Sequence, residues 1–281
     1  MTTVTDSPPR RGQLVRGAAY HLPRLAVAML FLLPSVWLIS ASLRQTGLPP
    51  PRTIEWPPNP LAWSNYRRVF ELVPLARYAG NSLLVVLFAV PLTVITASWA
   101  GLAMTQLPKP LRQALVIIAA MLLMVPTVSL WLPRFIVFKH LGLIDTRWAL
   151  VAPAVMGSSP LFVLLYYWTF RRLPQTMFES ARLDGASLLQ IWAHVAMPLA
   201  WPTSVAVVVL TFILYWSDFV SPLLYLKSER LYTLPVGVQS LQQMDAIDWP
   251  LLMAGAAIMT GPVLLLFLIG QRFFWPERHG L

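Results

Sequence analysis

The sequence predicts an all-α membrane protein with several transmembrane helices. Of its 281 residues, 57% are hydrophobic and only 11% are charged, whereas about 25% of the residues in soluble domains are charged. Mean hydropathy is +0.64. The apolar residues gather in six runs, each close to the roughly 20 residues that a helix needs to cross a bilayer. We therefore expect a polytopic helical protein with six spans and no attached soluble domain.

The six expected spans are separated by polar or proline-containing segments. Arg24 and Arg44 bracket the first span and fix its limits. A membrane domain should therefore cover residues 25–275, between an N-terminal tail (1–24) and a C-terminal tail (276–281). The expected spans are Leu25–Leu43, Ser82–Leu107, Leu111–Leu132, Ala149–Phe170, Ala200–Val220 and Leu251–Phe273.

The distribution of basic residues indicates the orientation. The formal net charge is +10, but the 21 Lys and Arg residues are scattered at the ends of apolar runs. This pattern favours an orientation signal and anionic lipid over nucleic acid as the reason for the charge. Basic residues divide almost evenly between the two sides of the membrane, so their total count does not determine the orientation. The flank before the first span is rich in arginine, and on this basis we expect both termini in the cytoplasm. A cleaved signal peptide is disfavoured, because the first run exceeds the usual 7–15 apolar residues.

A polar segment from Arg171 to Ser187 separates the fourth and fifth spans. Thr176 with Glu179, and Ser187 with Gln190, match the capping-box pattern of helix N-termini. A glycine lies between the two patterns, where a helix C-terminus uses a left-handed residue. We expect a short helix over 177–184, a glycine turn, and a second helix from 188 that ends before Pro198.

The first of these short helices should lie at the cytoplasmic face, because its charged residues would be costly in hydrocarbon. Its apolar residues could be covered by a soluble protein or could rest on lipid. Interfacial helices are usually rich in Lys and Arg and are seldom broken by glycine, so the pattern favours a protein partner. The apolar residues are Met177, Phe178, Ala181 and Leu183.

The segments Glu179-Ser180-Ala181 and Asp184-Gly185-Ala186-Ser187 resemble the Glu-Ala-Ala loop of ABC-importer permeases, above all the MalG-type subunits of carbohydrate uptake systems. Ser180 stands where the family usually has Ala. The resemblance extends from about residue 25 to 275, and the tail from Trp275 departs from it. Its further motifs are Asn81-Ser82-Leu83, His140 to Thr146, Tyr215-Trp216-Ser217-Asp218-Phe219 and Leu234-Pro235-Val236-Gly237.

This resemblance implies a type I importer permease fold in the inner (cytoplasmic) membrane. It implies three kinds of partner: a second permease subunit, two ATP-binding subunits and an extracytoplasmic solute-binding protein. The segment 174–198 would be the coupling segment that contacts the ATPase. The residues implied in coupling are Glu179, Ser180, Ala181, Asp184, Gly185, Ala186 and Ser187.

The chain itself has no expected cofactor, metal site or catalytic residue. It contains no Gly-x-x-x-x-Gly-Lys phosphate loop, and none of its three lysines follows a glycine. ATP and magnesium should therefore bind to the partner ATPases. The four histidines lie in separate segments, which disfavours an intramembrane hydrolase. A secondary transporter is also disfavoured, since it has no use for a glycine-broken docking segment.

Two further sets of residues are candidates for contact with solute or binding protein. Tyr215, Trp216 and Asp218 could line the translocation pathway, because sugar rings stack on aromatic side chains and an intramembrane carboxylate usually faces a bundle interior. An interfacial aromatic belt is the alternative. In the outer segment 226–250, contact with the binding protein and an ordinary solvated connection stay open. The residues concerned are Gln239, Gln242, Gln243 and Asp245.

The expected cargo is a disaccharide, an oligosaccharide or a related carbohydrate. This expectation rests on the resemblance, and another polyol or a glycerol-phosphate-type solute is the alternative. No residue in the sequence chooses among these solutes.

Overall fold

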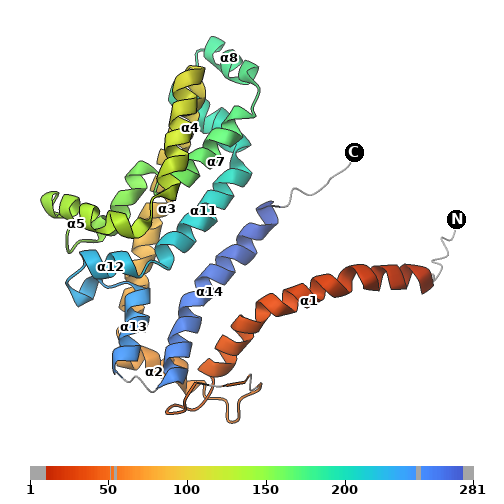
Figure 1. Ribbon diagram of the computed structural model, residues 1–281, viewed down its shortest axis with the longest axis vertical. Helices are drawn as coiled ribbons and strands as arrows, with labels where there is room; N and C mark the ends of the chain where they lie inside the picture. The colour runs from red at the N-terminus through yellow and green to blue at the C-terminus, as the bar shows by residue number, and fades with distance from the viewer. Residues whose placement is uncertain (1–10, 51, 54–55, 245–247, 275–281) are drawn as a thin grey trace.

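The computed structural model describes residues 11–50, 52–53, 56–244 and 248–274. Within these ranges all regular structure is helical, as the sequence predicts. Figure 1 shows an elongated bundle with one helix, α1 (Arg11–Ser42), leaving it sideways. The expected tail segments 1–10 and 276–281 lie outside the described residues. Part of the expected N-terminal tail is already helical, because α1 begins at Arg11.

Four stretches of described helix are long and apolar enough to cross a membrane, and up to six spans result if two bent helix pairs are each counted as one. This agrees with the six apolar runs of the sequence. The continuous stretches are Leu22–Ser42 of α1, α3 (Leu75–Gln106), residues 147–171 and Trp249–Gln271 of α14 (Trp249–Phe274). Residues 147–171 comprise α6 (Arg147–Val151), η2 (Ala152–Met156) and α7 (Pro160–Arg171).

The third expected span is shorter than the apolar run suggests. Helix α4 (Lys109–Met124) ends eight residues before Leu132, and the chain then bends by 98°. Pro126 explains the break, because the residue before a proline avoids the helical conformation, and Val125 is extended at φ −72° and ψ 121°. The chain continues sideways as η1 (Thr127–Leu130) and α5 (Trp131–His140), as Figure 1 shows.

Helix α3 forms the axis of the bundle, with α7, α11 (Trp201–Trp216) and α13 (Leu234–Met244) packed along it and α14 packed against α11 and α13. The crossing of α3 and α7 is close: a Cβ atom added to Gly101 would lie 2.7 Å from Tyr166 Cβ and 2.8 Å from Tyr167 N. Only glycine allows this approach.

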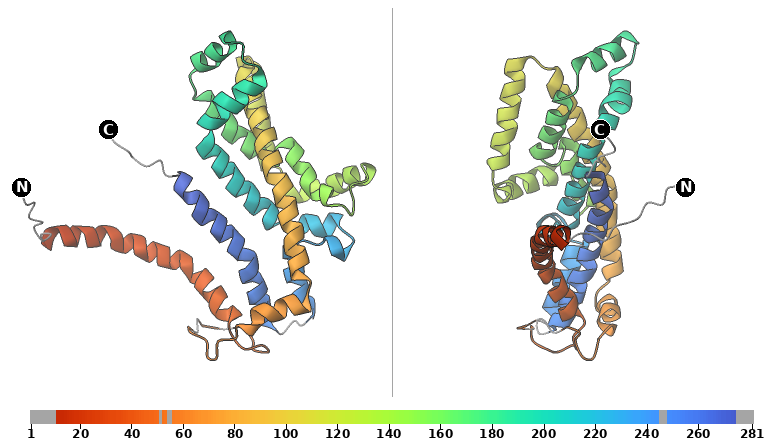
Figure 2. Two further views of the ribbon diagram at one scale, coloured as in Figure 1. Left: turned by 180° about the vertical axis from the view of Figure 1, so that it is seen from behind. Right: turned by 90° about the vertical axis from the view of Figure 1, so that its right-hand side faces the viewer.

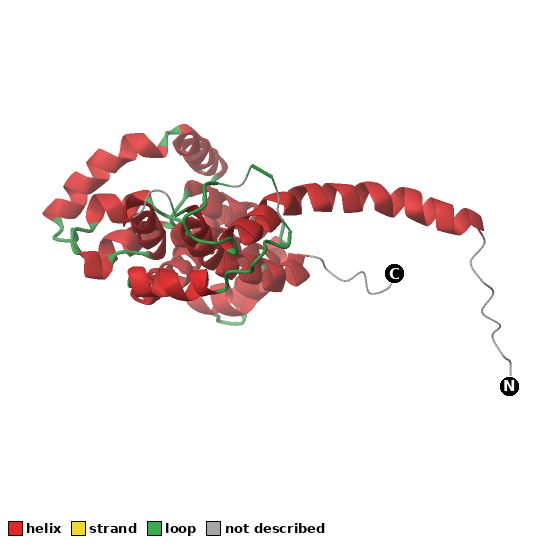
Figure 3. Ribbon diagram, turned by 90° about the horizontal axis from the view of Figure 1, so that it is seen from below, coloured by secondary structure: helices red, strands yellow, loops and turns green. Residues whose placement is uncertain are grey.

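Helix α1 packs against α14. Its middle, including Leu30 and Phe31, is exposed at 64% and 77%. Figure 3 shows the helix that leads to the N-terminus extending away from the other helices.

The bundle carries different short elements at its two ends. In Figures 1 and 2, α8 (Gln175–Leu183) lies at one end, and α2 (Ser64–Leu72) and α13 lie near the other. The long helix α3 thus separates α8 from α2 and α13.

Much of the described part of the segment 226–250 is helical. It contains η4 (Glu229–Leu231) and α13, and one face of α13 is buried through Leu234, Val238 and Leu241. These residues have the i, i+4, i+7 spacing of an amphipathic helix, which the polar residues between them obscure. Residues 226–244 are therefore a folded part of the bundle.

Candidate functional site

Helix α8 opens the coupling segment. It starts directly after Pro174, and no side chain caps its N-terminus. The expected capping box of Thr176 and Glu179 is therefore wrong: Thr176 lies inside the helix rather than at the cap position. The proline sets the start of the helix, because it suits the position before the first helical residue and has no N–H to satisfy.

Gly185 ends the helix in the left-handed conformation that the sequence predicts. Its φ is +81°, Gly185 N donates to Arg182 O at 3.0 Å, and Ala186 N donates to Ala181 O at 3.0 Å. These bonds satisfy carbonyls at the helix end. A Cβ atom on Gly185 would meet nothing within 4 Å, so the backbone conformation alone favours glycine here.

The second capping box is confirmed. Ser187 Oγ accepts from Gln190 N at 3.4 Å, and Gln190 Oε1 accepts from Ser187 N at 2.8 Å. The helical run that follows comprises α9 (Leu188–Gln190), the π-helical turn η3 (Ile191–Ala196) and α10 (Met197–Leu199).

The prediction that this run ends before Pro198 is wrong. Pro198 lies in the first turn of α10, where a proline is tolerated. The run ends instead at Ala200, where the chain bends by 86° into α11.

Contacts on both the apolar and the polar side of α8 attach this helix to the rest of the bundle. Phe178 is only 2% exposed and belongs to an apolar cluster with Phe170 and Ile191. It therefore cannot offer its ring to a partner protein, as the sequence suggested. On the polar side, Arg182 Nη2 donates to Gln106 Oε1 at the end of α3. A displacement of α8 must therefore move the elements packed against it.

The opposite side of the coupling segment is open and mixes apolar with acidic groups. Leu183 is 88% exposed, and Leu188 and Leu189, which sequence reasoning missed, are 73% and 60% exposed. Glu179 and Asp184 are also exposed. The sequence did carry a signal for these exposed side chains, because two adjacent leucines directly follow a predicted helix N-cap. Of the other expected coupling residues, Ser180, Gly185 and Ser187 are exposed and Ala181 and Ala186 are half-buried.

A cavity of about 540 Å³, with a mixed polar and apolar lining, lies between the α4–α5 bend, residues 153–160 and the junction of α11 with α12 (Val220–Tyr225). Tyr215 and Asp218 both line it. The Tyr215 hydroxyl and Ser158 Oγ are hydrogen-bonded at 2.8 Å, and Asp218 Oδ1 accepts from Ser221 N at 3.1 Å. The structure therefore brings two of the three expected pathway residues to one cavity.

Trp216 does not line this cavity. Its ring stacks on Phe212, and its Nε1 donates to Met259 O of α14 at 2.9 Å. Because successive side chains along a helix point in different directions, adjacent residues of the motif contact different neighbouring elements. Arg134 of α5 lines the cavity instead. An arginine inside an apolar run is the signal that sequence reasoning missed.

The expected contact residues of the outer segment lie on α13. Gln242 and Gln243 are exposed and Gln239 is half-buried. Asp245 lies outside the described residues.

The bundle of long apolar helices and its glycine-broken terminal segment are those of a polytopic membrane protein. Residues 89–278 match the family described as binding-protein-dependent transport system inner membrane component, and the chain belongs to this family. The resemblance drawn from the coupling segment is thereby confirmed, as is the type I importer permease fold.

Two curated relatives align with most of the chain. The sulfoquinovosyl glycerol transport system permease protein of Agrobacterium fabrum is 28% identical over 240 residues, which cover 85% of this chain and 84% of the relative. The trehalose transport system permease protein of Mycobacterium tuberculosis is 29% identical over 243 residues, covering 86% and 88%.

Among solved structures, a chain of a bacterial ABC transporter involved in alginate import is similar in fold. The TM-score is 0.74 at 20% identity, and the match covers 96% of this chain and 100% of the other.

Proposed function

We propose that this chain is the permease subunit of an ATP-driven importer that passes a carbohydrate from an external solute-binding protein into the cytoplasm. Two permease relatives are named for a glycosyl glycerol and for trehalose, which supports a carbohydrate cargo. The observation that carries the proposal is the coupling segment: α8 is fixed to the core on one side and exposes leucines and carboxylates on the other.

The exposed side of the coupling segment docks on an ATPase subunit, where ATP and magnesium bind. Leu183, Leu188 and Leu189 supply the apolar contact, since burying such side chains is worth about 1.5–3 kcal/mol each. The exposed Glu179 carboxylate lies one helical turn from Leu183 on α8 and is available to a cationic group of the ATPase. Gly185 lets the chain leave α8 at the required angle.

Movement of α8 is transmitted to the cavity through the helices that connect them. The run 188–199 joins α8 to α11, and the far end of α11 carries Tyr215. Asp218 follows immediately in the chain. Closure of the ATPases would shift α8 and thereby change the cavity between α11 and the α4–α5 bend. In this proposal α8 and both termini lie on the cytoplasmic side of the membrane, and α13 lies on the outer side.

On the outer side, α13 faces the solute-binding protein through Gln242 and Gln243. Gln239 and Asp245 belong to the same proposed contact. A second permease subunit would complete the pathway beside this cavity.

Transport by the reconstituted complex tests this proposal. A tagged form of the chain, purified from its own membranes, should bring an ATPase and a second permease with it. In proteoliposomes with the binding protein, uptake of a labelled disaccharide should require ATP. Uptake driven by an ion gradient alone, without an ATPase partner, would exclude the importer. Competition by maltooligosaccharide, trehalose and glycerol 3-phosphate separates the carbohydrate cargo from the polyol-phosphate alternative.

Charge removal at the docking side tests the coupling segment itself. Glu179→Ala should lower ATP-driven uptake at least tenfold while the permease heterodimer still assembles. Lys109→Ala is the matched control, because Lys109 is an exposed charged residue at the start of α4, outside the coupling segment. Equal uptake by the two variants would contradict the role of Glu179.

A further inference from the structure

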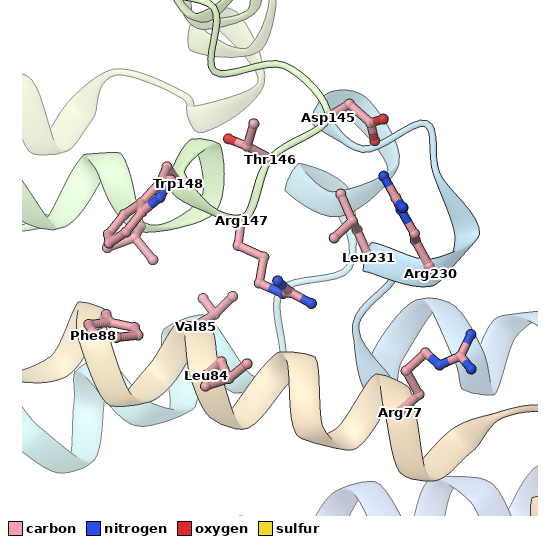
Figure 4. A pocket seen from close by; sticks show the side chains of 11 residues that line it. Arg77, Leu84, Val85, Phe88, Asp145, Thr146, Arg147, Trp148, Arg230 and Leu231 are labelled. Atoms are coloured by element: carbon pink, nitrogen blue, oxygen red, sulfur yellow. The ribbon is translucent and has the colours of Figure 1, made fainter.

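Three arginines have no part in the proposed transport mechanism. Arg77 of α3, Arg147 of α6 and Arg230 of η4 line one pocket of about 760 Å³. Figure 4 shows them arriving from three segments that are far apart in the sequence. By the proposed orientation they lie on the outer half of the molecule, where the positive-inside rule does not account for them.

The polar side of this pocket carries a net positive charge. Arg147 donates from Nε and Nη2 to Asn81 Oδ1 at 3.2 Å and 2.9 Å, but the amide is neutral and leaves the charge of the guanidinium uncompensated. One carboxylate, Asp145, also lines the pocket, and its oxygens already accept from Lys227 N, Ser228 N and Ser228 Oγ. Three guanidinium groups thus face one carboxylate.

The other side of the pocket is apolar. Leu84, Phe88 and Trp148 are exposed at 40%, 50% and 58%, and the rings of Phe88 and Trp148 lie 5.6 Å apart. Figure 4 shows these side chains on the opposite side of the pocket from Arg77 and Arg230. Along α3, Phe88 lies about 16 Å beyond Arg77, toward the middle of the span. The pocket is therefore charged near the end of the helix and apolar toward its middle. This order matches the charged headgroup and apolar acyl chains of a phospholipid.

We infer that this pocket binds an anionic phospholipid from the leaflet on the α13 side of the membrane. The phosphate lies among the guanidinium groups, which bind phosphate oxygens in bidentate geometry. The acyl chains run along Leu84, Phe88 and Trp148. An acidic side chain of a soluble partner would satisfy the arginines but would leave this apolar half, on a membrane-spanning helix, uncovered. The inference does not depend on the identity of the transported solute.

Lipid retention by the purified complex tests the inference. The intact complex in detergent is titrated with phosphatidylglycerol or phosphatidylcholine of the same acyl chains, and bound lipid is counted by native mass spectrometry. We expect stronger binding of phosphatidylglycerol. The double variant Arg77→Gln/Arg230→Gln should weaken its binding about 30-fold, at about fivefold per guanidinium removed. Binding of phosphatidylcholine should not change.

The matched control is Arg68→Gln. Arg68 is an exposed arginine of α2 near the same end of the molecule, outside the pocket, and its Nη1 donates to Thr46 Oγ1. This variant should bind phosphatidylglycerol like the wild type. Trp148→Ala should weaken binding of phosphatidylglycerol without removing any charge, which a site for free phosphate would not show.

Three results would overturn the inference. The first is equal binding of the two lipids. The second is binding of glycerol 3-phosphate as tight as that of phosphatidylglycerol, which would indicate a site for free phosphate. The third is a double variant that retains phosphatidylglycerol but loses affinity for the solute-binding protein, which would indicate an acidic protein partner. Solute uptake by these variants tests the transport mechanism and is not a criterion for lipid binding, which is measured separately.

Discussion

At the scale of single residues, Asn81 shows how one buried amide can join distant parts of the chain. Asn81 is 3% exposed. Its Nδ2 donates to the carbonyl oxygens of Arg230 and Tyr232, both at 2.9 Å, and its Oδ1 accepts from Arg147. Neighbouring Ser82 Oγ accepts from Leu234 N at 2.9 Å. The Asn-Ser pair at the start of α3 therefore positions the outer segment.

Asn81→Ala should destabilise the folded chain by about 2 kcal/mol, because it leaves two partly buried carbonyl groups without their donor. Thermal unfolding of the purified complex measures this change. Asn81→Asp restores an acceptor for Arg147 but not the two donors, so it should not recover the wild-type melting temperature. If Asn81→Ala melted like the wild type, these hydrogen bonds would not hold the outer segment.

Asp145 makes a second contact to the same segment, and this one depends on pH. The Ser228 hydroxyl, followed by the backbone amides of Ser228 and Lys227, lowers the pKa of Asp145 from 3.8 to about 2. A carboxylate with a lowered pKa in the folded state stabilises the fold above its ordinary pKa, and this contribution disappears as pH falls through its folded pKa. Its stabilisation should therefore be complete above about pH 4 and be lost toward pH 2.

Hydrogen exchange of the peptide 226–231, corrected for intrinsic rates, tests this expectation. Protection should be constant down to about pH 4 and then decrease. Asp145→Asn should reduce protection at neutral pH already, whereas Asp184→Asn, at the opposite end of the molecule, should not. Equal protection in wild type and Asp145→Asn would show that the carboxylate does not hold this segment.

At the scale of elements, two local patterns were predicted correctly, one was not, and distant contacts were missed. The capping box of Thr176 and Glu179 was wrong because α8 starts earlier, directly after Pro174. The Gly185 turn and the Ser187–Gln190 cap involve residues within a few positions of one another, so their residue types suffice to predict them. The inward direction of Phe178 and the contact of Trp216 with α14 depend on neighbours that only the folded chain brings together. The bend after Met124 was signalled by Pro126, but the length of the apolar run outweighed that signal.

The backbone of Gly185 offers a sharp test of the coupling segment. Gly185→Ala should add about 1–2 kcal/mol of backbone strain at φ +81° without a steric clash. We expect the chain to assemble but ATP-driven uptake to fall several-fold. Gly142→Ala is the matched control, because Gly142 has φ +68° and equally open surroundings, but lies in the loop before α6. Equal loss in both variants would mean that strain alone, rather than the position of α8, reduces transport.

At the scale of the whole molecule, the proposed mechanism requires α8 and α13 to face opposite sides of the membrane. The sequence contains no cysteine, so a single introduced thiol can be labelled without background. Leu183→Cys and Gln242→Cys place that thiol at exposed positions on α8 and α13. The vesicles should hold the permease subunits without the ATPase, which would cover Leu183. With the coupling segment in the cytoplasm, a membrane-impermeant maleimide should then label Gln242→Cys in right-side-out vesicles and Leu183→Cys only after permeabilisation. The cysteine-free chain should not be labelled in either state. The reverse pattern would place the ATPase-docking side outside, where no ATP is available, and the proposed coupling would be wrong.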